Sequence, residues 1–439
     1  MKQRQNLSHA LWIPLIWLLM LGSRSVSFWF GARSVGDTQL DGSPLDRLVY
    51  LFLIVAGLLV LAQRRIQWSQ LIADNKWLSI FFLYLGISVL WADYPFVAFK
   101  RWFKDAGNII LVLVILSEED PVEATRAMFL RCAYVLVPLS VLVIKYFPDL
   151  SRTYAPWTGA VEYCGVSGSK NMLGSTLILY SIALLWEALE LHDDQSGARK
   201  RFEKSSCVLF LGMIAWLFLK AHSQTSFACT LLGGGILLAM RLSFIRSRAS
   251  RIEIYAVTLA LLFLLFNSVF DIAGIFVHAL GRNLTFTGRT EIWQRVLGVP
   301  INPLIGTGYY SFWLDPNRVE KVSEGFFFHL DEAHNGYIET YLNGGLIGAF
   351  LLVVLIAFAL RKIKRDFLNE GDRFSIVRLA FLAIAVVYNF TEAAFDRQSF
   401  VWFALLLAIV GRLRQVTLAQ EGRRDQPEPH AVAPLIEGS

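Results

Sequence analysis

Charged residues are scarce in this chain of 439 residues. Asp, Glu, Lys and Arg together make up 17% of it, where soluble domains carry roughly 25%. Hydrophobic residues make up 55%, and they gather into many runs of about 18 or more, the length that crosses a bilayer as an α-helix. This pattern excludes a water-soluble multi-domain protein and predicts an all-α, polytopic membrane protein.

Cysteine is also rare, and the four present are Cys132, Cys164, Cys207 and Cys229. Cys164 alone falls in a predicted outer loop, so no internal disulfide is expected there. The chain has no Cys-x-x-Cys pair, so its cysteines give no sign of a metal site.

The chain has no acidic excess, and its net charge is +6. A basic balance fits either a nucleic-acid partner or the cytoplasmic loops of a membrane protein. The second interpretation is favoured because basic residues retain such loops on the cytoplasmic side. No nucleic-acid partner is expected.

Window hydropathy predicts about twelve transmembrane spans. Their approximate limits are 9–30, 45–63, 76–91, 103–117, 125–147, 171–190, 206–221, 225–242, 253–270, 335–360, 374–391 and 399–414. The first follows the basic start MKQRQ, so a cleaved signal peptide is the alternative. We keep it as a span because no clear small-x-small cleavage site follows.

Lysine and arginine gather in the loops after predicted spans two, six, eight, ten and twelve. The positive-inside rule assigns these loops and both termini to the cytoplasm. Two outer loops are long, 148–170 and 271–334, and long ordered loops are often functional. We therefore expect a transmembrane domain over 1–414, with a large periplasmic loop at 271–334, and a disordered cytoplasmic tail over 415–439.

Seven polar segments stand at the predicted outer ends of spans or in outer loops. They are WADYPFVAFKRWFK (91–104), GVSGSKNMLG (165–174), HSQTSF (222–227), FTGRTEIWQR (286–295), GTGYYSFW (306–313), EAHNGYIETYLNGGLIG (332–348) and NFTEAAF (389–395). The orientation rests on basic residues elsewhere, so this clustering is partly independent of it and predicts an active surface outside the cytoplasm.

Several cations lie on this outer side, against the positive-inside bias. They are Lys100, Arg101, Lys104, Lys170, Arg282 and Arg289. Phosphate or carboxylate binding would explain them, because arginine forks match phosphate oxygens and lysine acts as a point charge. The alternative is an interfacial side chain that snorkels to the headgroups.

Lys170 and Asn171 stand where a helix is predicted to begin, after glycines and serines. Free backbone N–H groups at such a start favour anions. The segment is neither a Walker loop nor a hydrolase elbow. Arg289 precedes a second predicted helix start, which Thr290 can cap, and is free to reach a ligand.

The segment AHNGYIETY begins the tenth predicted span. His334, at its mouth, could be a general base near neutral pH, or an interfacial histidine bonded to a neighbour. Asn335, Tyr337 and Glu339 follow within the first turns, and polar residues at membrane depth usually face a cavity or the interior of the bundle. Asp331 and Glu332 are expected to be solvated loop residues. A metal site in HLDEAH (329–334) is an alternative, but its spacing matches no standard zinc site.

The order of these motifs resembles the O-antigen ligase and polymerase superfamily, in particular its exopolysaccharide polymerase branch. The matching parts are KN-x-LG, TGRT-x-IW, G-x-G-Y, AHN-x-Y-x-E with its following glycines, and NF-x-E, which together span about residues 91–395. Many relatives read GHKN where this chain has GSKN at 168–171, which puts any role of that histidine in doubt here.

The resemblance implies a GT-C-like glycosyltransferase of the bacterial inner membrane that needs no metal or other cofactor. Its donor would be a glycan on polyprenyl pyrophosphate, and its acceptor a glycan or lipid-linked hydroxyl. His334 and Arg289 would be catalytic, with Lys170, Asn171, Arg101, Arg282, Asn335, Tyr337, Glu339 and Glu392 binding substrate. Membrane lipids, a flippase and a chain-length regulator are the implied partners.

Two other functions remain open on the sequence alone. An O-antigen ligase would move a finished chain to a lipid core. A polysaccharide or lipid transporter would instead carry ionisable residues at mid-span and often inverted repeats. The predicted spans have few charges at their centres, which favours an enzyme over a transporter.

Overall fold

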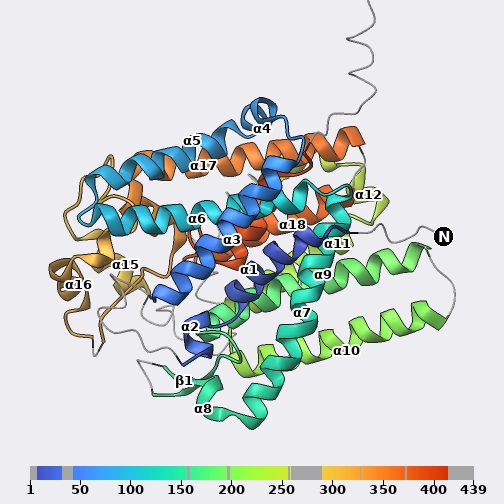
Figure 1. The fold of residues 1–439 in the computed structure, drawn as a ribbon, viewed down its shortest axis with the longest axis horizontal. Helices are drawn as coiled ribbons and strands as arrows, with labels where there is room; N and C mark the ends of the chain where they lie inside the picture. Colours follow the sequence, from blue (N-terminus) through green and yellow to red (C-terminus); the bar gives the residue numbers. More distant parts are fainter. Residues whose placement is uncertain are drawn as a thin grey trace, which may run out of the picture.

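The computed structural model describes residues 7–31, 43–155, 159–194, 198–255, 258, 289–326, 328–370 and 373–413. These residues form α-helices with one short β-hairpin, β1 (Arg152–Tyr154) paired antiparallel with β2 (Val161–Tyr163). The described part of the chain is therefore all-α in class, as predicted, and the helices form one bundle (Figure 1). Segments 256–257, 259–288 and 414–439 lie outside it, and with them most of predicted span 253–270.

A helix overlaps each predicted span other than 253–270, although several helices differ from the predicted limits by eight to ten residues. In chain order they are α1 (Trp12–Gly22), α2 (Val26–Trp29), α3 (Pro44–Gln63), α4 (Trp68–Asp74), α5 (Lys76–Ile87), α6 (Pro95–Leu116), α7 (Pro121–Tyr146), α8 (Pro148–Ser151), α9 (Lys170–Asp194), α10 (Ala198–Ala221), α11 (Gln224–Ala239), α12 (Ser243–Arg246), α15 (Arg289–Leu297), α16 (Pro316–Ser323), α17 (Gly336–Glu370), α18 (Arg373–Tyr388) and α19 (Phe400–Val410).

Five of the described helices are long and apolar enough to cross a membrane, lying within α3, α7, α9, α10 and α17. Four shorter apolar helices lie at 9–22, 76–91, 224–239 and 400–410. The chain is thus a multi-pass membrane protein. The total of twelve spans stays a prediction.

The first predicted span, 9–30, is too long. Helix α1 ends at Gly22, where Ser23 is extended. The loop before α9 reaches this end of α1, since Ser167 Oγ donates to the Gly22 carbonyl (2.9 Å) and Arg24 N donates to the Val166 carbonyl (3.0 Å). These bonds replace the helical ones that a continuous span would make.

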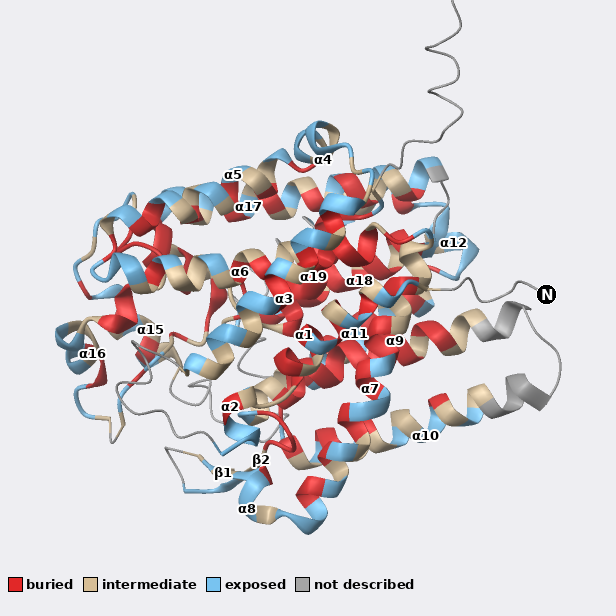
Figure 2. Ribbon diagram, in the orientation of Figure 1, coloured by how far each residue is buried: buried red, intermediate tan, exposed pale blue. Residues whose placement is uncertain are grey.

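Helix α19 forms the centre of the bundle. Every residue from Phe400 to Val410 is buried, as Figure 2 shows for the middle of the molecule. A helix that is apolar on all sides is stable only when other elements surround it, and α6, α9, α17 and α18 pack against α19. The loop before α19 (389–399) is thereby held in place, and it carries the candidate site.

Helix α17 contains a kink at Gly345, which has φ 62° and ψ −159°. Segment 303–308 packs against the kink and forms backbone hydrogen bonds with residues on both sides of it. Thr307 N donates to the Leu342 carbonyl (2.8 Å), and Leu346 N donates to the Pro303 carbonyl (2.8 Å). A Cβ on Gly345 would lie 2.3 Å from the Leu304 carbonyl carbon. Glycine is required here by conformation and by space.

Substitution of this glycine should therefore destabilise the protein strongly. We expect Gly345→Ala to cost more than about 2 kcal/mol, since positive φ strains alanine and backbone atoms must move. The measurement is the unfolding temperature in detergent. Gly235→Ala is the matched control, because a Cβ there meets no atom within 4 Å and alanine favours a helix. Equal unfolding temperatures for the two variants would contradict this account of the kink.

Candidate active site

The candidate site lies at the start of α17, where two polar segments far apart in sequence are bonded together. Asn335 Oδ1 accepts from the backbone N–H groups of the first turn of α17 (3.0 and 3.1 Å), and Asn335 Nδ2 donates to the Phe390 carbonyl (3.1 Å). Gly336 N donates to the carbonyls of Asn389 (2.9 Å) and Glu392 (3.0 Å). Asn335 is thus a helix cap, and the cap brings AHNG beside NFTE.

Glu392 is the meeting point of four segments. Its Oε1 lies 2.7 Å from Nη2 of Arg289, at the start of α15. Its Oε2 accepts from Nδ2 of Asn171, in the first turn of α9 (2.9 Å), and lies 3.8 Å from Nδ1 of His334. Glu392 is 5% exposed. The structure therefore brings Arg289, Asn171 and His334 together on one buried carboxylate.

His334 stands between two carboxylates. Its backbone has φ 50°, and Nδ1 lies 2.6 Å from Glu332 Oε1. Burial by itself would lower the pKa of His334, but the charges of Glu332 and Glu392 outweigh it and raise the pKa to about 10. This shift favours the imidazolium at neutral pH, whereas a general base would need the neutral imidazole.

Glu332 forms ion pairs with other side chains of the site. The prediction that it is a solvated loop residue is therefore wrong. His334 and Arg397 both contact it, and Arg397 Nη1 lies 2.6 Å from Glu332 Oε2. Burial opposes ionisation, but these two cations hold the pKa of Glu332 well below its usual range. Asp331 is exposed, as predicted.

Arg397 is a residue that the sequence reasoning missed. Its guanidinium bridges Glu332 and Glu339, whose Oε2 lies 3.7 Å from Nη2. It also lies over the Tyr310 ring, 5.4 Å from the centroid. The sequence feature that could have identified Arg397 is a basic residue in an outer loop. Arg397 lies in the predicted outer loop between spans eleven and twelve.

Removing the guanidinium of Arg397 should leave Glu332 and Glu339 without their shared counter-ion. We expect Arg397→Gln to destabilise the protein by about 3–5 kcal/mol, the usual cost of breaking a buried ion pair. Thermal unfolding in detergent measures it. Arg318→Gln is the control, because its partner Asp93 has a 37% exposed side chain and exposed pairs contribute about 0–1 kcal/mol. A loss no larger than that of Arg318→Gln would show that Arg397 is not a structural bridge.

Glu339 and Tyr337 have partners of their own within the fold. Glu339 accepts from Trp313 Nε1 (3.0 Å) and from the backbone N–H of Ala333 (2.6 Å). Tyr337 donates its hydroxyl proton to the Val386 carbonyl (2.8 Å). These contacts give both residues a role in holding the entrance of α17, beside the substrate-binding role expected from the sequence.

Lys170, Arg101 and Arg282 are the other cations predicted to bind substrate. Lys170 Nζ pairs with Glu162 of β2, which ties the hairpin to the start of α9. Arg101 Nη1 donates to the Tyr310 carbonyl (3.4 Å), on the side of the site where Arg397 lies. Arg282 lies outside the described residues.

Ser169 has a structural role where many relatives carry histidine. Its Oγ accepts from Met172 N (3.2 Å), and its carbonyl accepts from Leu173 N (3.0 Å). Ser169 therefore caps α9, and this cap places Asn171 against Glu392.

Glu332, His334 and Glu392 place one ligand atom each within 4.8 Å of one another, so they could surround a cation. Arg289 and Arg397 already contact the two carboxylates. A metal ion here would lie beside two guanidinium charges, which oppose it. These two guanidinium charges therefore disfavour a metal ion at this position.

Two comparisons bear on identity. Residues 208–353, which include Arg289, His334 and Glu339, match the family described as O-antigen ligase. The chain is also 26% identical over 362 residues to the exopolysaccharide production protein ExoQ of Rhizobium meliloti (strain 1021), covering 78% of this chain and 77% of that protein. Both comparisons support the resemblance of the chain to the O-antigen ligase and polymerase superfamily that its motifs indicate.

Proposed function

We propose that this protein is a membrane glycosyltransferase that polymerises polyprenyl-pyrophosphate-linked oligosaccharide repeat units into an exopolysaccharide or O-antigen. The supporting observation is the convergence of Arg289, Asn171 and His334 on Glu392. The family and the similarity to an exopolysaccharide production protein support the same class of reaction. The reaction takes place at the periplasmic face of the inner membrane, and both termini are cytoplasmic.

The network suits a reaction whose leaving group is a diphosphate. The cations Arg289 and His334 lie beside Glu392. When the donor binds, its diphosphate oxygens replace Glu392 as their partner, because guanidinium and imidazolium groups bind phosphate oxygens through charge-assisted hydrogen bonds. Glu392 is thereby released as a carboxylate next to the reacting sugar.

The proposed glycosyl transfer uses Arg289, His334 and Glu392 in these roles. The acceptor hydroxyl oxygen attacks the anomeric carbon, and the bond from that carbon to the diphosphate oxygen breaks. The electron pair of this bond stays on the diphosphate, where Arg289 and His334 stabilise the developing charge. The hydroxyl proton passes to the Glu392 carboxylate. His334 does not take this proton, since its pKa of about 10 keeps it protonated.

An O-antigen ligase is the second candidate, favoured by the description of the matching family. A deletion strain separates the two reactions by the product that accumulates. If the protein is a polymerase, lipid-linked single repeat units accumulate in the deletion strain. Expression of the wild-type protein, but not of His334→Gln, then restores long polysaccharide chains. Long chains that remain unattached to a lipid core would instead identify a ligase. An unchanged product would contradict both.

A further inference from the structure

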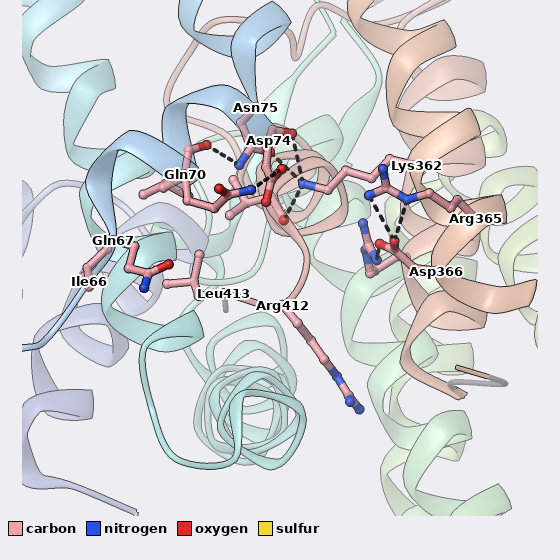
Figure 3. A pocket seen from close by; sticks show the side chains of 13 residues that line it. Ile66, Gln67, Gln70, Asp74, Asn75, Lys362, Arg365, Asp366, Arg412 and Leu413 are labelled. Atoms are coloured by element: carbon pink, nitrogen blue, oxygen red, sulfur yellow. Dashed lines mark hydrogen bonds and ion pairs between the residues drawn. The ribbon is translucent and has the colours of Figure 1, made fainter. Parts of the chain in front are cut away.

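A polar cavity lies at the opposite end of the bundle from Glu392 (Figure 1). It has a volume of about 380 Å³ and lies among the end of α4, the C-terminal parts of α17 and α19, and the start of α18 (Figure 3). Four cations line it, Lys362, Arg365, Arg378 and Arg412, together with the carboxylates Asp74 and Asp366. Lys362 lies roughly 25 Å along α17 from the kink at Gly345, at about 1.5 Å per residue, so one phosphate group cannot reach both sites.

Two of the cations are held rigidly by the end of α19. Lys362 is 8% exposed, and its Nζ donates to the Val410 carbonyl (2.8 Å), to Asn75 Oδ1 (2.8 Å) and to the Asp74 carbonyl (3.4 Å). Arg378 is 1% exposed, and its Nε donates to the Ala408 carbonyl (2.9 Å). Basic side chains near a helix C-terminus stabilise its last carbonyls, so the fold fixes both charges at the cavity wall.

The charges that line the cavity do not balance. Asp366 lies 2.8 Å from Arg378 Nη1 and 3.4 Å from Arg365 Nη2. The Asp74 side chain accepts from Gln70 Nε2 (3.1 Å), and the hydrogen bonds of Lys362 Nζ given above go to neutral oxygens. Three arginines and two carboxylates line the cavity together with Lys362, so basic groups outnumber acidic groups in the lining. A partly enclosed cavity focuses such a field on an anion.

We propose that this cavity binds a phosphate group, as carried by the headgroup of an anionic lipid. Arginine and lysine donors around a polar cavity match phosphate oxygens. The cavity lies where the basic loops after predicted spans two, ten and twelve meet, the side that the positive-inside rule assigns to the cytoplasm. Basic pockets between transmembrane helices on that side bind phosphate headgroups. Inorganic phosphate shares this chemistry, and the experiment distinguishes the two sources.

The test uses the full-length protein purified in a neutral detergent, with retained lipid measured by native mass spectrometry. The probes are phosphatidylglycerol, phosphatidylcholine and inorganic phosphate. The variant is Arg365→Gln/Arg412→Gln, since both residues are exposed and neither caps α19. Arg361→Gln is the matched control, because Arg361 is on the same helix, has a 76% exposed side chain and does not line the cavity.

We expect the double variant to bind phosphatidylglycerol more weakly by about 20- to 30-fold, at about fivefold for each basic residue. Arg361→Gln should bind as the wild type does. Preference for phosphatidylglycerol over inorganic phosphate identifies a lipid site, and equal displacement by inorganic phosphate identifies a free-phosphate site. Wild-type binding by the double variant, equal loss in Arg361→Gln, or equal binding of phosphatidylcholine would overturn the proposal.

Discussion

Arg289→Ala should reduce polymer formation at least about 100-fold while the protein stays in the membrane at the wild-type level. Removing one preorganised stabiliser of developing charge costs about 100- to 1,000-fold in rate, and Arg289 is the arginine that contacts Glu392 in the described structure. Arg289→Lys keeps the charge but loses the fork, so we expect it to be intermediate. The measurement is polymer made per unit of membrane protein.

The control for Arg289 lies on the same helix. Arg295 pairs with Glu291 (2.8 Å), whose side chain is 52% exposed, so Arg295→Gln should leave polymer unchanged. A second measurement separates diphosphate binding from folding: added farnesyl pyrophosphate should raise the unfolding temperature of Arg295→Gln but not of Arg289→Ala. Wild-type polymer from Arg289→Ala would remove this residue from the site.

His334→Gln should lower the rate by about 100-fold or more, and the pH profile should identify the role of His334. The pKa of His334 is raised to about 10, so the cation is present at neutral pH. Activity that needs the cation falls as the pH rises toward 10. Activity that needs a neutral imidazole rises over the same range, and that result would contradict the cationic role.

Folding stability gives an independent test of the same charge. A group whose pKa is higher in the folded than in the unfolded protein stabilises the fold fully below the unfolded value, about 6.5, and loses this contribution as the pH rises through the folded value. The unfolding temperature of the wild type should exceed that of His334→Gln most at about pH 6. The difference should shrink toward pH 10. A difference that does not depend on pH would show that Glu332 does not hold a charged imidazole.

Much of this site could be predicted because the membrane topology and the sequence motifs both select the same residues as site candidates. The predicted outer ends of the spans brought Asn171, Arg289, His334 and Glu392 to one side of the membrane. The structure then places them around a single carboxylate. Hydropathy could assign each residue to a side of the membrane, but it could not predict which residues touch. The contact between α17 and the segment after α18 depends on the helix cap at Asn335.

The residues that were missed depend on loop conformation. Glu332 contacts His334 at a turn where the backbone of His334 has positive φ, and hydrophobic periodicity does not predict such a turn. Arg397 lies in a short loop whose place is set by the buried helix after it. The length of α17 was also underestimated, 335–360 against Gly336–Glu370. Its last turns are charged and continue the helix beyond the apolar run that hydropathy detects.

The most direct test of the proposed function is chain elongation by the purified protein. The full-length protein in lipid nanodiscs is incubated with polyprenyl-pyrophosphate-linked repeat units, and product length and released polyprenyl pyrophosphate are measured together. We predict a ladder of longer chains with one polyprenyl pyrophosphate released for each new linkage, lost in Arg289→Ala and His334→Gln and kept in Arg295→Gln. Repeat units that stay unjoined, with no polyprenyl pyrophosphate released by the wild type, would contradict the assignment and favour a transporter.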